Sequence, residues 1–334
     1  MKFTEGYWEK SERANASHAM QAFIVEEIPN GMRVIAPFHK ITDRAGALDV
    51  GTITTEFTAT RKDIISVRSW HFEGYKKKEP RFQMNIDMQD VTVEINEKEA
   101  VMTAGRMQVL IDREEFRITY MADGKELTTC GFRNLGYMQY DRECLTKFPQ
   151  ENYMAAKYTP YMSTELSLAP GECVYGLGER FTSFVKNGQV VDCWNEDGGT
   201  ASQISYKNIP FYMTNKNYGV LVDHTDNVSF EVASEKVEYV GFSVKGEEIR
   251  FHLIYGDTMK DVIRNYTDLT GKPALPPTWS FGLWLTTSFT TNYDEETTNS
   301  FIQGMADRDI PLSVFHFDCF WICLLYTSPS PRDR

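Results

Sequence analysis

The stretch Gly271-Lys-Pro-Ala-Leu-Pro-Pro-Thr-Trp-Ser-Phe-Gly-Leu-Trp-Leu285 divides the chain into two parts of different character. It holds three prolines within five residues, and prolines neither continue a helix nor fit inside a sheet, so we expect a linker here. The run Trp279–Leu285 that follows is almost entirely apolar, which is typical of a strand buried on both faces of a parallel sheet. The fold class therefore changes at this linker.

Short strands with alternating apolar residues fill the chain from about residue 19 to residue 255. The clearest segments are 91–95, 116–120, 218–222, 228–232 and 249–253. Polar or glycine-containing turns separate them, and many short strands at such spacing predict antiparallel sheets packed as a sandwich.

Helical spacing appears just before the linker. The apolar residues between Met259 and Leu269 recur on one face of a helix. Asp257 or Thr258 is suited to cap its start, and Gly271 is suited to end it.

A strand, a helix and a second strand are expected after the linker. Asp294 resembles the N-cap of a helix that runs to about Asp307, with Phe301 and Ile302 among its inward residues. Leu312–Phe317 is again nearly all apolar. Together with Trp279–Leu285 this makes one βαβ unit.

A (β/α)8 barrel takes roughly 250 residues, so this unit only begins one. We therefore expect an antiparallel β-sandwich over 1–257, a connecting helix and proline-rich linker over 258–278, and the start of a truncated TIM barrel over 279–322.

The last residues, Cys323-Leu-Leu-Tyr-Thr-Ser-Pro-Ser-Pro-Arg-Asp-Arg334, show no strand or helix periodicity. They resemble the translation of a transposase-type sequencing adapter; the alternative is a natural flexible tail. We leave 323–334 out of the fold prediction and expect the gene to continue past Ile322.

Charge and composition limit the partners that we expect. The chain has 35 Lys and Arg against 47 Asp and Glu, a net charge of −12, which disfavours nucleic acid and anionic membrane surfaces. We find no apolar run long enough to span a membrane and no signal sequence. The six cysteines fit neither a metal site nor a disulfide pattern, so we expect free thiols in a cytoplasmic protein.

Five segments resemble bacterial α-xylosidases of glycoside hydrolase family 31. They are Val174–Phe181, Trp194–Thr200, Lys207–Met213, Pro273–Asp294 and His316–Trp321. The resemblance implies a β-sandwich followed by a (β/α)8 barrel, and hydrolysis of α-glycosides with retention of the anomeric configuration.

Such chemistry uses two carboxylates about 5 Å apart and needs neither cofactor nor metal. In the family both are aspartates on later barrel strands, so we expect no catalytic residue in this chain, because both would lie beyond residue 322. Relatives form homo-oligomers, which makes self-association of the full-length parent plausible.

Asp318 directly follows a predicted buried strand, which in a barrel is the mouth where sites are built. A carboxylate there can accept two sugar hydroxyls; the alternative is an Asp that caps the next helix or turn. The resemblance implies that this aspartate binds the non-reducing sugar. It also implies that Cys319 and Phe320 fill the space of a glucose hydroxymethyl group, so that xylose fits and glucose clashes. Ordinary packing at a strand end is the other interpretation of these two residues.

Two loop residues complete the expected substrate site. Phe289 follows the first barrel strand and is suited to stack on a sugar face, unless it only packs. Asp197 lies in a turn with two glycines, and the resemblance implies that this sandwich loop reaches the barrel mouth. The alternative for Asp197 is a solvated turn carboxylate.

The sequence thus predicts a substrate-binding portion of an enzyme for α-xylosides, inactive as this fragment. Two alternatives stay open. One is an α-glucosidase of the same family. The other is a non-catalytic carbohydrate-binding module built on the sandwich.

Overall fold

The computed structural model describes residues 3–5, 9–74, 80–141, 158–196, 202–287, 291 and 293–318. The chain separates into two compact units, Met1–Gly271 and Lys272–Arg334. The expected connector 258–278 is divided at this point, because its helix belongs to the first unit. The segment 323–334, which resembles an adapter translation, lies outside the described residues.

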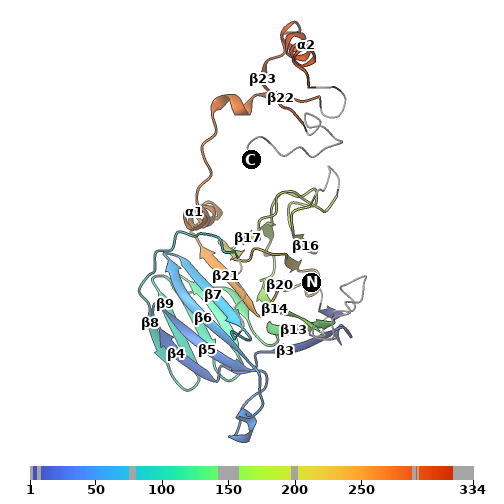
Figure 1. Ribbon diagram of the computed structural model, residues 1–334. Coiled ribbons are helices and arrows are strands. Elements are labelled where there is room, and N and C mark those ends of the chain that lie inside the picture. Colours follow the sequence, from blue (N-terminus) through green and yellow to red (C-terminus); the bar gives the residue numbers. More distant parts are fainter. Residues whose placement is uncertain are drawn as a thin grey trace. The chain divides into compact units, whose positions relative to one another are not determined.

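The largest sheet of the first unit is antiparallel and has eight strands (Figure 1). In spatial order these are β15 (Val174–Gly176), β17 (Phe211–Thr214), β18 (Tyr218–Val222), β21 (Glu248–Tyr255), β7 (Ile64–Trp70), β6 (Thr52–Arg61), β5 (Gly31–Pro37) and β4 (Ile24–Ile28).

Two further antiparallel sheets have six and five strands. The six-stranded sheet runs β16 (Gln189–Cys193), β19 (Val228–Val232), β20 (Tyr239–Lys245), β14 (Tyr158–Ser167), β13 (Leu135–Asp141) and β3 (Ala14–His18). The five-stranded sheet runs β12 (Lys125–Cys130), β11 (Arg117–Ala122), β10 (Met107–Asp112), β9 (Glu99–Ala104) and β8 (Thr92–Ile95). Small elements complete the unit: β1 (Thr4–Glu5), β2 (Glu9–Lys10) and the 3-10 turn η1 (Ala45–Ala47).

The core forms where the inner face of the eight-stranded sheet meets the other two sheets. Phe251 of β21 contacts Phe242 of β20 edge to face, with ring centroids 5.3 Å apart. Its ring also lies 6.5 Å from that of Tyr120 of β11, which in turn is 6.3 Å from Phe57 of β6. All four side chains are fully buried in one cluster. These packed antiparallel sheets confirm the predicted antiparallel β-structure of this part of the chain.

Helix α1 (Met259–Thr270) covers part of the outer face of the eight-stranded sheet. Val262 and Leu269 of the helix are buried against Ile254 of β21, and Tyr266 stacks on Phe211 at 4.2 Å. The predicted helix is confirmed, with Thr258 as its N-cap and Gly271 at its C-cap.

The second unit contains η3 (Thr278–Phe281), β22 (Leu283–Leu285), α2 (Glu295–Ala306) and β23 (Leu312–Phe315). Strands β22 and β23 pair in parallel, so strand, helix and strand follow in the predicted order. Asp294 caps α2 by accepting a hydrogen bond of 2.8 Å from the backbone N–H of Thr297, as expected.

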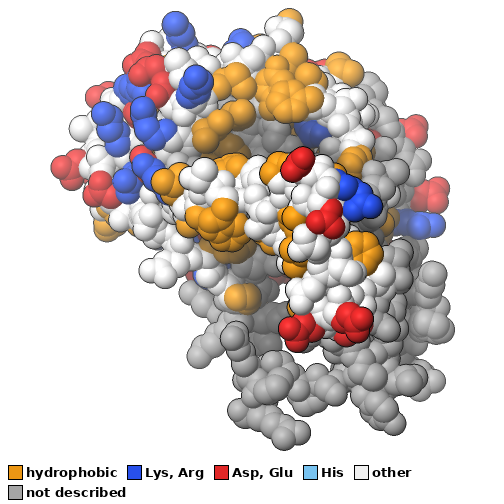
Figure 2. Space-filling model, turned by 90° about the horizontal axis from the view of Figure 1, so that it is seen from above, with side chains coloured by type: hydrophobic (Ala, Val, Ile, Leu, Met, Phe, Trp, Pro, Cys, Tyr) orange, Lys and Arg blue, Asp and Glu red, His pale blue; other side chains and the backbone are white. Residues whose placement is uncertain are grey.

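Three expectations for the second unit, including the inward position of Phe301 and Ile302, are wrong. Residues 279–281 form a 3-10 turn instead of strand, because the carbonyl of Trp279 accepts from the N–H of Gly282 and closes the turn. The two strands are also not buried on both faces: Leu283 is 44% and Trp284 51% exposed. Phe301 and Ile302 of α2 are exposed as well. The elements described in this unit, two strands and one α-helix, leave these side chains uncovered. Several hydrophobic patches are visible on one face of the molecule in the space-filling view (Figure 2).

None of the helices in the described part of the chain has the length and apolar character needed to cross a membrane.

Candidate functional site

The candidate substrate site lies where β22 and β23 end. Because the strands are parallel, their carboxyl ends meet at the same edge, which is where α/β folds build their sites. The backbone N–H of His316 donates to the carbonyl of Leu285 at 2.7 Å and continues the pairing past β23. Thr286 and Thr287 follow β22, and Asp318 follows β23, so polar side chains from both strands gather at this edge.

Tyr293 connects the two strand ends. Its hydroxyl is 3.2 Å from Oγ1 of Thr286, and its ring lies 5.1 Å from that of Phe317. Desolvation acts to raise the pKa of Tyr293, but hydrogen bonds with Thr286, Thr287 and the backbone of Asp318 outweigh it, so the pKa is lowered. These partners favour a hydroxyl oxygen that accepts hydrogen bonds.

Asp318 is half-buried at this edge, and its carboxylate acts electrostatically on Tyr293. A carboxylate at a strand end beside a tyrosine hydroxyl and two threonines can accept hydrogen bonds from a polyhydroxylated ligand. The structure thus brings Asp318 to a polar strand edge, while its role in binding a sugar stays a prediction.

The other four predicted site residues are Asp197, Phe289, Cys319 and Phe320. All four lie outside the described residues. Their assignment as substrate contacts therefore stays a prediction too.

Arg180 ties together three segments of the sandwich around the predicted Asp197 loop. Its Nε donates to the carbonyl of Leu177 at 3.1 Å, and its two terminal nitrogens donate to the carbonyls of Gln203 at 3.0 Å and Asp192 at 2.9 Å. It also donates to Oδ1 of Asn208. One guanidinium thus satisfies carbonyls on both sides of segment 194–202.

The two arms of that segment are joined to each other as well. Asn195 and Ser205 form a parallel bridge, and the N–H of Glu196 donates to the carbonyl of Ser205 at 3.1 Å. Nδ2 of Asn208 donates to the carbonyl of Trp194 at 2.8 Å. Arg180 and Asn208 therefore position the ends of the segment that carries Asp197.

Sequence reasoning missed Tyr293, Arg180 and Asn208. All three lie inside segments that carry the family resemblance: Arg180 in Val174–Phe181, Asn208 in Lys207–Met213 and Tyr293 in Pro273–Asp294. Their partners are distant or irregular in sequence, and only the folded chain reveals them.

Two of the three free cysteines in the described part of the chain, Cys130 and Cys193, are buried. Burial raises the pKa of Cys193 to about 11 and raises the pKa of Cys130 further, so neither thiol is a ready nucleophile. No group of three or more His, Cys, Asp or Glu side chains among the described residues is arranged to hold a metal ion.

Two family models match the chain. The glycosyl hydrolase 31 N-terminal galactose mutarotase-like domain matches residues 54–231, and the glycosyl hydrolases family 31 TIM-barrel domain matches residues 273–328.

Curated relatives match almost the whole chain. The alpha-xylosidase XylQ of Lactiplantibacillus pentosus is 42% identical over 96% of this chain and 40% of its own length. An alpha-xylosidase of Emericella nidulans is 41% identical over 96% of this chain and 42% of its own length. The chain thus spans about two fifths of these relatives.

Among solved structures, the cycloalternan-forming enzyme from Listeria monocytogenes superposes with a TM-score of 0.72 at 17% identity. The match covers 91% of this chain and 27% of that one. At this identity the likeness concerns the fold alone.

Proposed function

The chain belongs to glycoside hydrolase family 31, and we propose that it is the substrate-binding amino-terminal portion of an enzyme that removes terminal non-reducing α-D-xylosyl residues. The observation that carries the proposal is the identity of 42% and 41% with two α-xylosidases over 96% of the chain.

In this proposal Asp318 accepts hydroxyl hydrogen bonds from the xylosyl ring and fixes it at the carboxyl edge of the parallel strands. Cys319 and Phe320 occupy the space that the hydroxymethyl group of glucose would need, so a glucoside is rejected by steric conflict. Phe289 stacks on the sugar, and Asp197 of the sandwich loop approaches it. Arg180 positions that loop.

The segment 279–322 opens the catalytic barrel, and both catalytic aspartates lie beyond residue 322 in the full-length parent. One aspartate attacks the anomeric carbon and forms a glycosyl ester while the other donates a proton to the departing aglycone oxygen. Water then hydrolyses the ester and gives a proton to the second aspartate, so the anomeric configuration is retained. Residues 1–334 alone are therefore inactive.

We further propose that the parent works in the cytoplasm and self-associates. Three cysteines, Cys130, Cys173 and Cys193, are free thiols in the described part of the chain, which suits a reducing compartment. Light scattering of the full-length protein tests its association state.

The role of Asp318 is tested in the protein encoded by the complete reading frame. Asp318→Asn keeps the size of the side chain but removes the charge that binds hydroxyls, so kcat/KM for a chromogenic α-D-xyloside should fall by about 100-fold or more. Asp309→Asn, an exposed position of the same unit, is the matched control and should leave kcat/KM unchanged. Equal activity of both variants would remove Asp318 from the site.

A further inference from the structure

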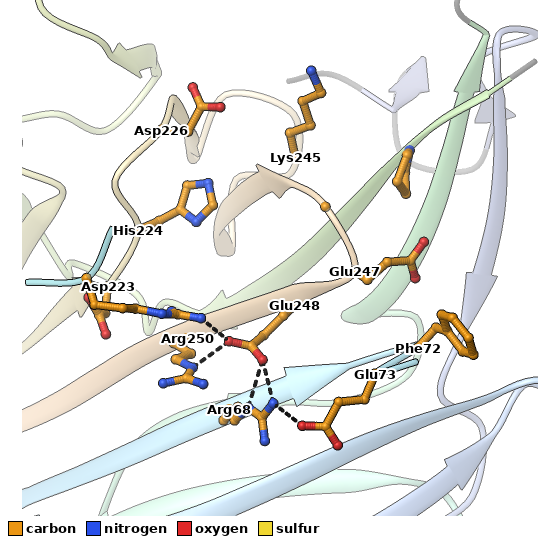
Figure 3. Close-up of a pocket in the computed structure, with 13 residues that line it drawn as sticks. Arg68, Phe72, Glu73, Asp223, His224, Asp226, Lys245, Glu247, Glu248 and Arg250 are labelled. Carbon is orange, nitrogen blue, oxygen red and sulfur yellow. Dashed lines mark hydrogen bonds and ion pairs between the residues drawn. The ribbon is translucent and has the colours of Figure 1, made fainter. Parts of the chain in front are cut away.

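A cavity of about 420 Å³ lies on the first unit, which is within the size range of small-ligand sites (Figure 3). Its walls come from five segments that are far apart in sequence: 68–73, Arg81, Pro160, 223–226 and 245–250. No described residue of the second unit lines it.

The cavity opens on the outer face of the eight-stranded sheet. Val67 and Phe251 point into the core, so their neighbours Arg68 and Arg250 point outward by strand alternation. Arg250 and Arg68 stand directly opposite each other in the register of β21 and β7. Two like charges in this position repel unless a carboxylate lies between them.

Glu248 supplies that carboxylate and organises the floor of the cavity. It accepts hydrogen bonds from Arg68 at 2.6 Å and Arg250 at 2.5 Å, drawn as dashed lines in Figure 3. It also accepts one from Arg81 at 2.9 Å. Burial acts to raise the pKa of Glu248, but Arg68 and Arg250 outweigh it and lower the pKa to about 2. The polar groups are therefore held in fixed positions before any ligand arrives.

The charges that line the cavity are balanced in sign. Four cationic side chains (Arg68, Arg81, Lys245 and Arg250) face five carboxylates (Glu73, Asp223, Asp226, Glu247 and Glu248). An anion or a cation would meet repulsion from one of the two sets. A neutral ligand whose hydroxyl groups both donate and accept hydrogen bonds can use both sets at once.

An aromatic side chain adds an apolar surface to this polar cavity. Phe72 is 58% exposed and lines one side, across the view from Asp223 and His224 (Figure 3). Pro160 also contributes to the lining. A pyranose ring offers hydroxyls at its rim and C–H groups on its faces, so it matches paired charges and an aromatic ring together.

We propose that this cavity is a carbohydrate subsite that binds one pyranose unit of a neutral oligosaccharide. The inference does not depend on the proposed hydrolysis, because Asp318 and the strand edge of the second unit take no part in it. It assigns to the sandwich a binding role of its own.

The test is isothermal titration of the full chain with maltotriose and, separately, with inorganic phosphate. We expect heat of binding with the trisaccharide and none with phosphate. Phe72→Ala should weaken trisaccharide binding by about tenfold or more, because the stacking surface is lost. Phe132→Ala is the matched control, since Phe132 is 56% exposed and lies outside the cavity. Lys245→Ala, which removes a charged side chain from the polar wall, should likewise weaken trisaccharide binding. Lys40→Ala, at an exposed lysine outside the cavity, is its matched control and should leave binding unchanged.

Asp318→Ala separates this subsite from the proposed substrate site. Trisaccharide binding that survives Asp318→Ala and is lost in Phe72→Ala supports the inference. Binding that is lost in Asp318→Ala and unaffected by Phe72→Ala overturns it. Absence of trisaccharide binding by the unaltered chain, or binding of phosphate alone, overturns it as well.

Discussion

Gly178 lies where two backbone segments approach each other closely beside Arg180. Its φ is +87°, and a Cβ atom there would lie 2.2 Å from the carbonyl oxygen of Lys207. The side-chain-free position thus allows segment 207–208 to approach the motif that ends in Arg180. Any larger residue must displace one of the two backbones.

Gly178→Ala should therefore lower the free energy of unfolding by about 2–4 kcal/mol, because backbone strain and a backbone collision add together. Gly188→Ala isolates the strain alone, since Gly188 has a φ of +86° and open space around it. That control should cost only about 1 kcal/mol. Urea denaturation measures both values, and equal losses would show that the close approach at Gly178 has no energetic weight.

His252 is a buried histidine that should make stability depend on pH. Its Nδ1 is 2.5 Å from Oγ of Ser66, which in turn is 2.6 Å from Oγ1 of Thr60. Burial, assisted by Arg250, lowers the pKa of His252 to about 4 from an ordinary value of 6.5. The unfolded chain therefore binds a proton at a pH where the folded chain does not.

The free energy of unfolding should consequently fall as the pH drops from 6.5 to about 4, by about 3 kcal/mol at most, and this contribution should level off below pH 4. Glu248, with its lowered pKa, adds a separate loss only between pH 4.5 and about 2. Urea titrations across this range provide the measurement. His252→Asn should flatten the upper window while His39→Asn, an exposed position, should not; a slope that persists in His252→Asn would contradict the assignment.

At the residue level, sequence patterns predicted where a candidate residue stands in the chain better than they predicted which residues it contacts. Asp318 was predicted directly after a strand ending at Phe317; strand β23 ends at Phe315, and Asp318 lies three residues further along with Tyr293 beside it. Arg180 was not predicted, because its partners Asp192 and Gln203 are held by long-range folding and not by local spacing. Backbone carbonyls as partners leave no signature in a sequence.

Helix α1 shows how local sequence determines the ends of an element. Oγ1 of Thr258 accepts from the N–H of Asp261 at 3.3 Å, and the carboxylate of Asp261 accepts from the N–H of Thr258 at 3.1 Å. This reciprocal pair satisfies two amides that would otherwise lack partners at the start of the helix.

Thr258→Ala should lower the free energy of unfolding by about 1 kcal/mol, because the cap is lost. Thr267→Ala, within the same helix, should instead leave stability unchanged or raise it by about 0.5 kcal/mol, because alanine is the better helix former. Hydrogen exchange of the α1 amides together with urea denaturation tests whether each substitution lowers or raises the free energy of unfolding. A loss of the same size in both variants would mean that the cap contributes nothing specific.

Strands were predicted most accurately where alternation and turn residues agreed. Segments 218–222 and 228–232 match β18 and β19 residue for residue. The apolar run Trp279–Leu285 was misassigned at its start, because hydrophobicity alone does not distinguish a 3-10 turn from a buried strand. The extended Pro277 and the turn closed by Trp279 and Gly282 decide the local conformation there.

The two units differ in how completely they cover their apolar side chains. The first unit buries one large cluster drawn from all three sheets. The second unit leaves Leu275, Phe281 and Trp284 exposed, with Leu275 at 95% and Phe281 at 76%. Apolar surfaces of this kind, beside a sheet that has two strands in the described part of the unit, favour association between chains.

Residues 1–334 should therefore self-associate, whereas residues 1–271 should be monomeric and unfold cooperatively. Size-exclusion chromatography with light scattering and thermal melting compare the two. Replacing Leu275 and Phe281 by Ser in the longer chain should reduce association, while the same change at the buried Leu253 should destabilise the fold instead. A monodisperse, cooperatively melting sample of 1–334 would contradict this account.

The sandwich and its linker were predictable from periodicity and proline spacing, while the outer cavity was not. Its walls join Arg68, Arg81 and Glu248 with two loops, and only the sheet register brings them together. The proposed hydrolysis was inferred from segments that resemble a family. Residue spacing alone did not predict it.

We propose that the parent of this chain is an α-xylosidase. The most direct test is the ratio of kcat/KM for chromogenic α-D-xyloside to that for the matching α-D-glucoside, measured with the protein encoded by the frame that continues past Ile322. We expect clear turnover of the xyloside, a ratio well above one, and no turnover by residues 1–334 alone. A ratio below one would make the parent an α-glucosidase, and no hydrolysis of either substrate would contradict the claim outright.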